Sequence, residues 1–271
     1  MSNSQAIGIF DSGIGGLTVM KQIMHKLPHE KLIYFGDSAR LPYGDKSADT
    51  ILRYSIENAI FLMEHQIKLL VIACNTASAY AVDKLKQILK IPIVDVIQPG
   101  VEHAAKASRH LRIGVLATRA TTESGIYPQQ IKKKLPSCQV YSMPCPLLVP
   151  LIEEHLFDHP ATQLIIKDYL APLKQSSIDT LLLGCTHYPL LRPLIQKEIG
   201  PHVYIVDSAS TCAEHVSLTL DTYNLHASPD EKPSHRFYVS DYPEKFRLHG
   251  SKFLGHPIDK VNIPLKMKFE I

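Results

Sequence analysis

The sequence lacks long apolar runs. No uncharged apolar stretch approaches the roughly 18 residues that a membrane-spanning helix requires. Residues 1–5 also lack the basic-then-apolar pattern that begins a secretory signal peptide. We therefore expect a cytoplasmic protein that has no membrane partner.

An excess of charge of one sign is missing as well. The formal net charge is only +3, and the densest basic cluster, at residues 132–134, is typical of a solvated helix end. We therefore expect no nucleic-acid partner. The five cysteines are an odd number and include no CxxC pair, which makes a disulfide framework or a zinc site a poor interpretation. Because no other metal-ligand spacing and no pyridoxal-lysine motif is visible, we expect neither a metal nor a cofactor.

The chain does contain short apolar runs that alternate with helix-like segments. Its 271 residues are 45% hydrophobic and 20% charged, which suits two medium-sized soluble α/β domains. Strands are predicted at residues 7–10, 32–35, 69–73, 91–96, 113–117, 140–143, 180–183 and 203–206. Helices are predicted at residues 17–27, 49–65, 161–173 and 210–223. The tail is expected to hold a strand at 236–240, a helix near 242–254 and a last strand at 260–264. This alternation favours parallel, doubly wound sheets.

The first eight strands form two sets of four. The spacing between matched strand centres runs from 106 residues (115 − 9) to 111 residues (205 − 94). Such a near-constant spacing predicts two similar doubly wound domains related by pseudo-two-fold symmetry, with the active site in the cleft between them. We assign residues 1–97 together with 208–271 to the first domain, and residues 98–207 to the second.

Two matched strands end in the same way. The apolar run at residues 69–73 leads directly into Cys74, and the run at 180–183 leads into Cys185. The carboxyl ends of strands form the ligand-facing edge of an open α/β sheet. A single buried cysteine is usually inert packing, but two at matched positions favour a functional role.

Polar residues follow each cysteine. Asn75 and Thr76 are expected to cap the next helix. A helix N-terminus stabilises a nearby anion by only about 0.3–1 kcal/mol, which is less than about one pKa unit. A thiol that ionises near neutral pH therefore needs another partner. His187 is the candidate beside Cys185, and Asp11 could serve on the other side.

Two loops at the same edge are candidate binding loops. Residues 11–16 read DSGIGG, a glycine-rich turn that could cradle a phosphate or carboxylate, although an ordinary tight turn remains open. Its spacing is not that of a nucleotide-binding loop. Asp11 could be a helix cap or a base that tunes a neighbour. Tyr43, between Pro42 and Gly44, marks either a shaped binding loop or a turn with a half-buried ring.

Six segments carry a resemblance to a known family: GIFDSGIGGLTV at 8–19, YFGD at 34–37, LPYG at 41–44, ACNTA at 73–77, GCTHYPLL at 184–191 and VDS at 206–208. In this order they resemble the aspartate/glutamate racemase superfamily, and the glutamate racemases within it. The resemblance implies that Cys74 and Cys185 are the acid/base residues, assisted by Asp11, Glu153 and His187. It implies substrate contacts at Asp11, Ser12, Tyr43, Gly44, Asn75, Thr76, Thr186 and His187.

The resemblance also implies an activity. It is the cofactor-independent interconversion of L-glutamate and D-glutamate, with Cys74 acting on the D form and Cys185 on the L form. The product would supply bacterial peptidoglycan synthesis, and we expect a homodimer. Two alternatives stay open: racemisation of aspartate or another small amino acid, and a two-lobed amino-acid binding protein without catalysis.

Overall fold

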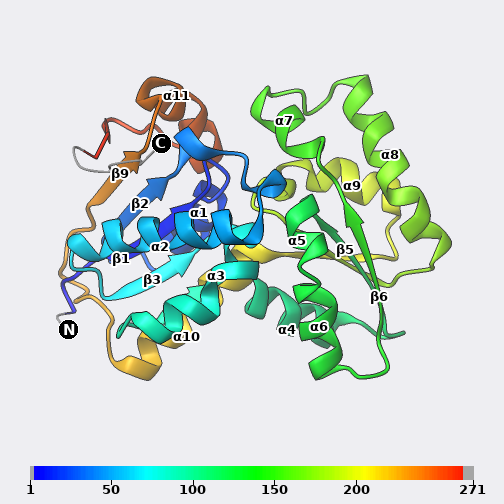
Figure 1. Ribbon diagram of the computed structural model, residues 1–271, viewed down its shortest axis with the longest axis horizontal. Coiled ribbons are helices and arrows are strands. Elements are labelled where there is room, and N and C mark those ends of the chain that lie inside the picture. Colours follow the sequence, from blue (N-terminus) through cyan, green and yellow to red (C-terminus); the bar gives the residue numbers. More distant parts are fainter. Residues whose placement is uncertain (1–2, 265–271) are drawn as a thin grey trace.

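The structure, a computed structural model, describes residues 3–264 and contains two parallel sheets (Figure 1). The larger sheet has the strand order β10-β9-β2-β1-β3-β4, and the smaller sheet has the order β6-β5-β7-β8. We call the parts built on these sheets the first half and the second half. The strands are β1 (Ile7–Asp11), β2 (Leu32–Gly36), β3 (Leu69–Ile72), β4 (Ile93–Asp95), β5 (Arg112–Ala117), β6 (Gln139–Pro144), β7 (Thr180–Gly184), β8 (Tyr204–Asp207), β9 (His235–Val239) and β10 (Val261–Asn262).

Helices connect the parallel strands, because two neighbouring parallel strands need a crossover connection between them. In the first half they are α1 (Leu17–Lys26), α2 (Ala48–Glu64), α3 (Asn75–Ile88) and α11 (Pro243–Leu254). In the second half and between the halves they are α4 (Ile97–Ala107), α5 (Arg119–Glu123), α6 (Ile126–Lys134), α7 (Leu148–Glu153), α8 (Pro160–Gln175), α9 (Arg192–Ile199) and α10 (Ser208–Tyr223). Short 3₁₀ turns lie at Ser38–Arg40, Tyr43–Asp45 and Tyr188–Leu191. None of the helices among residues 3–264 has the length and apolar character needed to cross a membrane.

The two halves repeat each other in detail. The order β2-β1-β3-β4 in the first half matches β6-β5-β7-β8 in the second. A Cβ placed on Gly8 of β1 would lie 2.6 Å from Ile67 Cδ1, and a Cβ on Gly114 of β5 would lie 2.6 Å from Ile178 Cδ1. In each half, therefore, a strand glycine leaves space for the side chain of an isoleucine that lies just before the neighbouring strand. The predicted pair of doubly wound sheets is confirmed.

The chain after α10 has no counterpart in the second half. β9 pairs with β2, and β10 pairs with β9, so the tail adds two strands to one edge of the larger sheet. The predicted strand at 236–240 and the helix near 242–254 are confirmed as β9 and α11, while the last strand is limited to β10. Helix α10 packs against α1 of the first half and α4 of the second. The domain boundaries after residues 97 and 207 stay a prediction.

The central strands are buried because helices cover both faces. Every residue of β1, β3 and β7 is buried, which explains their unbroken apolar sequences. Strand β6 is an edge strand and is only partly buried. In this arrangement, the polar residues that follow the buried strands gather at the junction of the two halves.

Candidate active site

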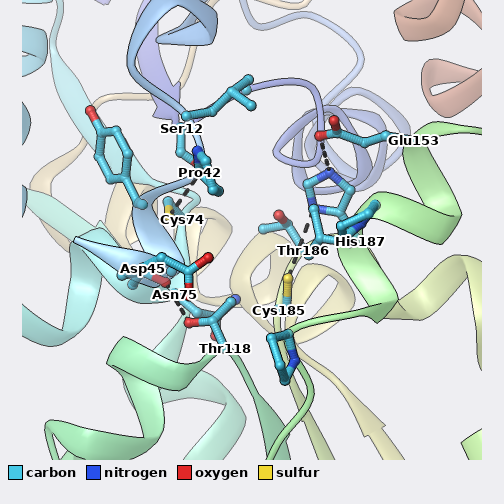
Figure 2. A pocket seen from close by; sticks show the side chains of 18 of the residues that line it. Ser12, Pro42, Asp45, Cys74, Asn75, Thr118, Glu153, Cys185, Thr186 and His187 are labelled. Atoms are coloured by element: carbon cyan, nitrogen blue, oxygen red, sulfur yellow. Dashed lines mark hydrogen bonds and ion pairs between the residues drawn. The ribbon is translucent and has the colours of Figure 1, made fainter. Parts of the chain in front are cut away.

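One cavity of about 270 Å³ lies between the halves and is lined from both of them (Figure 2). Strand ends supply Ser12 after β1, Cys74 after β3, Thr118 after β5, Cys145 after β6 and Cys185 after β7. Ten of the predicted site residues line it: Ser12, Tyr43, Gly44, Cys74, Asn75, Thr76, Glu153, Cys185, Thr186 and His187. Asp11 is the exception. The carboxyl ends of the two sheets therefore meet at this single cavity, as expected for open α/β sheets.

Cys74 occupies the N-cap of α3. Its backbone is extended, and its Sγ accepts a hydrogen bond from the Ala77 N–H at 3.5 Å. The cysteine is therefore the cap, and the prediction that Asn75 or Thr76 caps the helix is wrong, because α3 begins at Asn75. The Cys74 thiol lies 3.6 Å from Ser12 Oγ. Burial, reinforced by the carboxylate of Asp11, raises the pKa of Cys74 to about 12, so the thiol is protonated at neutral pH.

Asp11 lies behind the cavity wall and is completely buried. Its Oδ2 accepts a hydrogen bond from the Gly13 N–H at 2.9 Å, and its Oδ1 accepts one from Thr186 Oγ1 at 3.5 Å. Burial raises the pKa of Asp11, and the nearby His187 opposes that shift. Asp11 therefore links the first half to the loop that carries Cys185, and its roles as an assisting group and a substrate contact stay predictions.

The glycine-rich turn after β1 permits close approach. A Cβ on Gly15 would lie 2.4 Å from His187 Nδ1, and a Cβ on Gly16 would lie 2.5 Å from Asp11 Cβ. Neither glycine has a positive φ. The turn needs glycine because it packs directly against the side chains of the site, and its role as a cradle for a carboxylate stays a prediction.

His187 joins Cys185 to Glu153. Its Nδ1 lies 3.8 Å from Cys185 Sγ, and its Nε2 lies 3.1 Å from Glu153 Oε1 (Figure 2). Burial acts to lower the pKa of His187, but the hydrogen bonds to Cys185 and Glu153 outweigh it and raise that pKa to about 10. Burial likewise opposes ionisation of Glu153, yet the hydrogen bond from His187 brings its pKa below the usual value. At neutral pH, an imidazolium therefore lies between a carboxylate and the second thiol.

Sequence reasoning missed Thr118 and the hydroxyl cluster around it. The hydroxyls of Thr76, Thr118 and Thr121 lie 2.9 to 3.0 Å from one another, joining α3 to the end of β5. A usable signal was present, because the spacing of 106 residues that relates β1 to β5 carries Ser12 onto Thr118 (118 − 12). Repeat alignment of the strand ends would have placed a hydroxyl on both walls.

Tyr43 is fixed by a buried polar network. Its hydroxyl donates to Asp37 Oδ2 and accepts from Asn58 Nδ2 at 3.0 Å. Burial raises the pKa of Tyr43 well above its usual value, and the Asp37 carboxylate adds to that shift. The ring is buried and its loop contributes one wall of the cavity, so Tyr43 belongs to a shaped loop and is more than a half-buried turn residue.

The fold and the cavity define a two-lobed α/β protein of two parallel sheets, whose strand ends from both lobes line one cavity. A family model described as Asp/Glu/Hydantoin racemase matches residues 15–216. A glutamate racemase of Geobacter metallireducens is 48% identical over 257 residues, which covers 95% of each chain. The chain belongs to the Asp/Glu/hydantoin racemase family, and the relatives that it resembles within that family are glutamate racemases.

Solved structures agree with this assignment. The crystal structure of a Bacillus anthracis glutamate racemase is 37% identical, with a TM-score of 0.93 and coverage of 96% of this chain and 97% of that one. A Francisella tularensis glutamate racemase, solved in complex with D-glutamate, is 41% identical, with a TM-score of 0.91 and coverage of 97% and 98%. The resemblance seen in the sequence motifs is confirmed.

Proposed function

We propose that the chain interconverts L-glutamate and D-glutamate by proton transfer through Cys74 and Cys185. The observation that carries this proposal is the position of the two thiols, which follow matched strands and line the same cavity from different halves. A racemase needs a base on one face of Cα and an acid on the other, and two thiols on separate walls meet that need.

The proposed reaction removes one proton from Cα and returns one proton to the opposite face of Cα. In the L to D direction, the Cys185 thiolate removes the Cα proton, and the electron pair left on Cα is delocalised into the α-carboxylate. The Cys74 thiol then donates its proton to the opposite face, which leaves Cys185 as the thiol and Cys74 as the thiolate. The D to L direction reverses these steps.

The charges of the site support these roles. A Cys74 thiol whose pKa is about 12 begins as the proton donor. The His187 imidazolium, whose pKa is about 10, lies 3.8 Å from Cys185 Sγ and stabilises a thiolate there. Cys185, and then Glu153 through its 3.1 Å hydrogen bond, raise the pKa of His187 and so favour its charged form. Asp11 would assist on the Cys74 side, where its carboxylate influences that thiol.

The polar residues of the cavity are suited to hold the substrate. Helix α3 begins at Asn75, and the first backbone N–H groups of a helix have no intrahelical acceptors. The Ala77 N–H donates to Cys74 Sγ, which leaves the N–H groups of Asn75 and Thr76 for a carboxylate. Ser12, Thr76 and Thr186 add hydroxyls to the same lining. The proposed reaction uses the side chains and the backbone N–H groups of the cavity, and it needs neither a cofactor nor a metal.

The proposal extends to the cell. D-glutamate formed by this reaction would supply bacterial peptidoglycan synthesis. The enzyme would act in the cytoplasm, as a homodimer. Depleting the protein in its own host should make growth depend on added D-glutamate, and growth without it would refute this role.

Incubating the dialysed protein with L-glutamate in D₂O and a chelator tests the activity. We expect D-glutamate to appear with deuterium at Cα, measured by chiral chromatography and proton NMR. Conversion of L-aspartate in preference to L-glutamate would reassign the substrate. Binding of glutamate without exchange of the Cα hydrogen would indicate a binding protein, and activity that requires a divalent metal would refute the cofactor-free reaction.

A further inference from the structure

Asn75 makes a hydrogen bond that the proposed reaction does not explain. Its side chain is 2% exposed, and its Oδ1 accepts a 2.5 Å hydrogen bond from the hydroxyl of Tyr127 in α6. Its Nδ2 is buried and has no hydrogen-bond partner within residues 3–264. A buried donor without an acceptor is costly, and such groups are rare. Since Asn75 lines the cavity, the missing acceptor is one that a ligand can supply.

Tyr127 is held firmly in place. It is 1% exposed, and a Cβ on Gly184 would lie 2.9 Å from Tyr127 Cε2, so the ring packs directly against the residue that precedes Cys185. Burial raises the pKa of Tyr127 well above its usual value, so the hydroxyl stays protonated and remains a donor. Tyr127 thus contacts a neighbour of each thiol, Asn75 on one side and Gly184 on the other.

We propose that Tyr127 is a positioning residue that fixes the Asn75 amide with its Nδ2 donor held for a carboxylate of the bound amino acid. The two ends of an amide have nearly the same size but opposite hydrogen-bonding character. The hydrogen bonds among residues 3–264 give the Tyr127 proton no acceptor besides Asn75 Oδ1. With Nδ2 turned toward Tyr127 that buried proton would have no acceptor, so the hydroxyl favours the Oδ1 end and leaves Nδ2 for the substrate. Without that hydroxyl the amide can rotate, and Oδ1 then faces the anionic substrate. This inference rests on the proposed function, since it names glutamate as the anion.

The variant Tyr127→Phe keeps the ring against Gly184 and removes only the hydroxyl. We expect KM for both glutamate enantiomers to rise by about tenfold or more, the loss typical of a hydrogen bond to a charged group, while kcat changes by less than about threefold. Tyr80→Phe is the matched control. Tyr80 lies on α3, the helix that carries Asn75, and it is not part of the cavity lining. Its hydroxyl donates to the Ala120 carbonyl of the other half at 2.8 Å. Its KM should stay within about twofold of the unsubstituted protein, which is the normal range for sites without a functional partner.

A double-mutant cycle separates positioning from packing. If Tyr127 acts through Asn75, Tyr127→Phe should leave KM unchanged in an Asn75→Ala background. A wild-type KM in Tyr127→Phe, or an equal increase in both backgrounds, would overturn the inference while racemisation by the unsubstituted protein upholds the function. Calorimetric Kd values for glutamate in the same variants test the inference even in a protein that binds without racemising. A protein that does not bind glutamate would overturn both.

Discussion

The two thiols occupy matched positions in the two halves, yet their surroundings have opposite charge. Cys74 caps a helix and lies near the carboxylate of Asp11, which helps burial to raise its pKa to about 12. Cys185 lies beside the imidazolium of His187, whose other ring nitrogen is paired with the Glu153 carboxylate. The repeated fold therefore duplicates the backbone position of a thiol, and in the proposed reaction the side chains around each thiol set whether it begins as the acid or as the base.

The difference begins in the residues that follow each strand. After Cys74 the chain enters α3 at once, so the thiol sits where backbone N–H groups converge. After Cys185 the chain makes a 3₁₀ turn at Tyr188–Leu191 before α9 begins. Pro189 lies in the first turn of this segment, where a missing N–H is tolerated because the first N–H groups of a helix have no intrahelical acceptor. His187 directly precedes this turn, and its Nδ1 lies 3.8 Å from Cys185 Sγ.

Replacing each thiol by a hydroxyl should break the comparison most severely. We expect Cys74→Ser and Cys185→Ser each to lower the racemisation rate by at least about a thousandfold, because a hydroxyl is a far weaker acid than a thiol. With amino acids that carry a leaving group on Cβ, Cys74→Ser should eliminate only from the L form and Cys185→Ser only from the D form. Pyruvate or oxo-acid formation measures each reaction.

Cys212→Ser is the matched control for these variants. Cys212 is a buried cysteine of α10 that does not line the cavity, so its replacement should leave the handedness of elimination unchanged. If Cys74→Ser and Cys185→Ser both lose elimination from the same enantiomer, one of the two thiols is not a base.

We call His187 and Glu153, which follow Cys185 in a chain of hydrogen bonds, the relay; altering it should have the next largest effect. We expect His187→Asn to slow racemisation about a hundredfold, within the usual range for an acid/base partner, and Glu153→Gln to slow it about tenfold. Since the equilibrium constant between enantiomers is unity, kcat/KM stays equal in both directions. The asymmetry must therefore appear in the primary deuterium isotope effect, which should rise more for Cα-deuterated L-glutamate than for the D form.

Glu102→Gln gives a control for the loss of a carboxylate, because Glu102 pairs with Lys134 away from the cavity. It should leave both isotope effects unchanged. An equal rise of the isotope effect for both enantiomers in Glu153→Gln would indicate that the relay serves both thiols.

The parts of this comparison that the sequence predicts are those written in local patterns. Fully buried strands are unbroken apolar runs, and the residue after each run identifies the site edge, so both cysteines were found. The surroundings of the thiols were harder to predict from residue patterns. Tyr127 reaches Asn75 from a separate half, and nothing in the residues near either one indicates that contact. For Asp11 the residue pattern left a helix cap and a base both open, and Glu153 came from the family resemblance alone. Their distances to the thiols depend on how the halves meet.

The pH dependence of stability should distinguish the Cys185 side from the Cys74 side. The pKa of His187 rises from an ordinary 6.5 to about 10 in the folded protein. Its stabilising contribution is complete below about pH 6.5 and is lost as the pH rises towards 10, because the folded state then retains a proton that the unfolded state has lost. We expect the Tm to fall over this window, and to fall less in His187→Asn. Parallel Tm profiles for the two proteins would contradict the raised pKa. His226→Asn is the control, since that histidine lies on the surface with Asp221.

The smallest effect should come from the exposed ion pair that joins the halves. Arg119 Nη1 lies 3.2 Å from Asp45 Oδ1, and both side chains are more than half exposed, at 54% and 53%. Exposed pairs contribute only about 0–1 kcal/mol, because solvent screens the charges and ordering two long side chains costs entropy. Arg119→Ala should therefore change the Tm by no more than Lys174→Ala, which breaks a less exposed pair within the second half. Both residues of the Arg119 pair also line the cavity, so the two measurements separate two roles. If Arg119→Ala raises KM for glutamate about a hundredfold while the Tm is unchanged, Arg119 binds substrate. If KM stays within about threefold, the Arg119–Asp45 pair is only a weak surface contact between the halves. The buried hydrogen bonds of Asp11 and Asn75 then remain as the polar contacts that join the halves at the site.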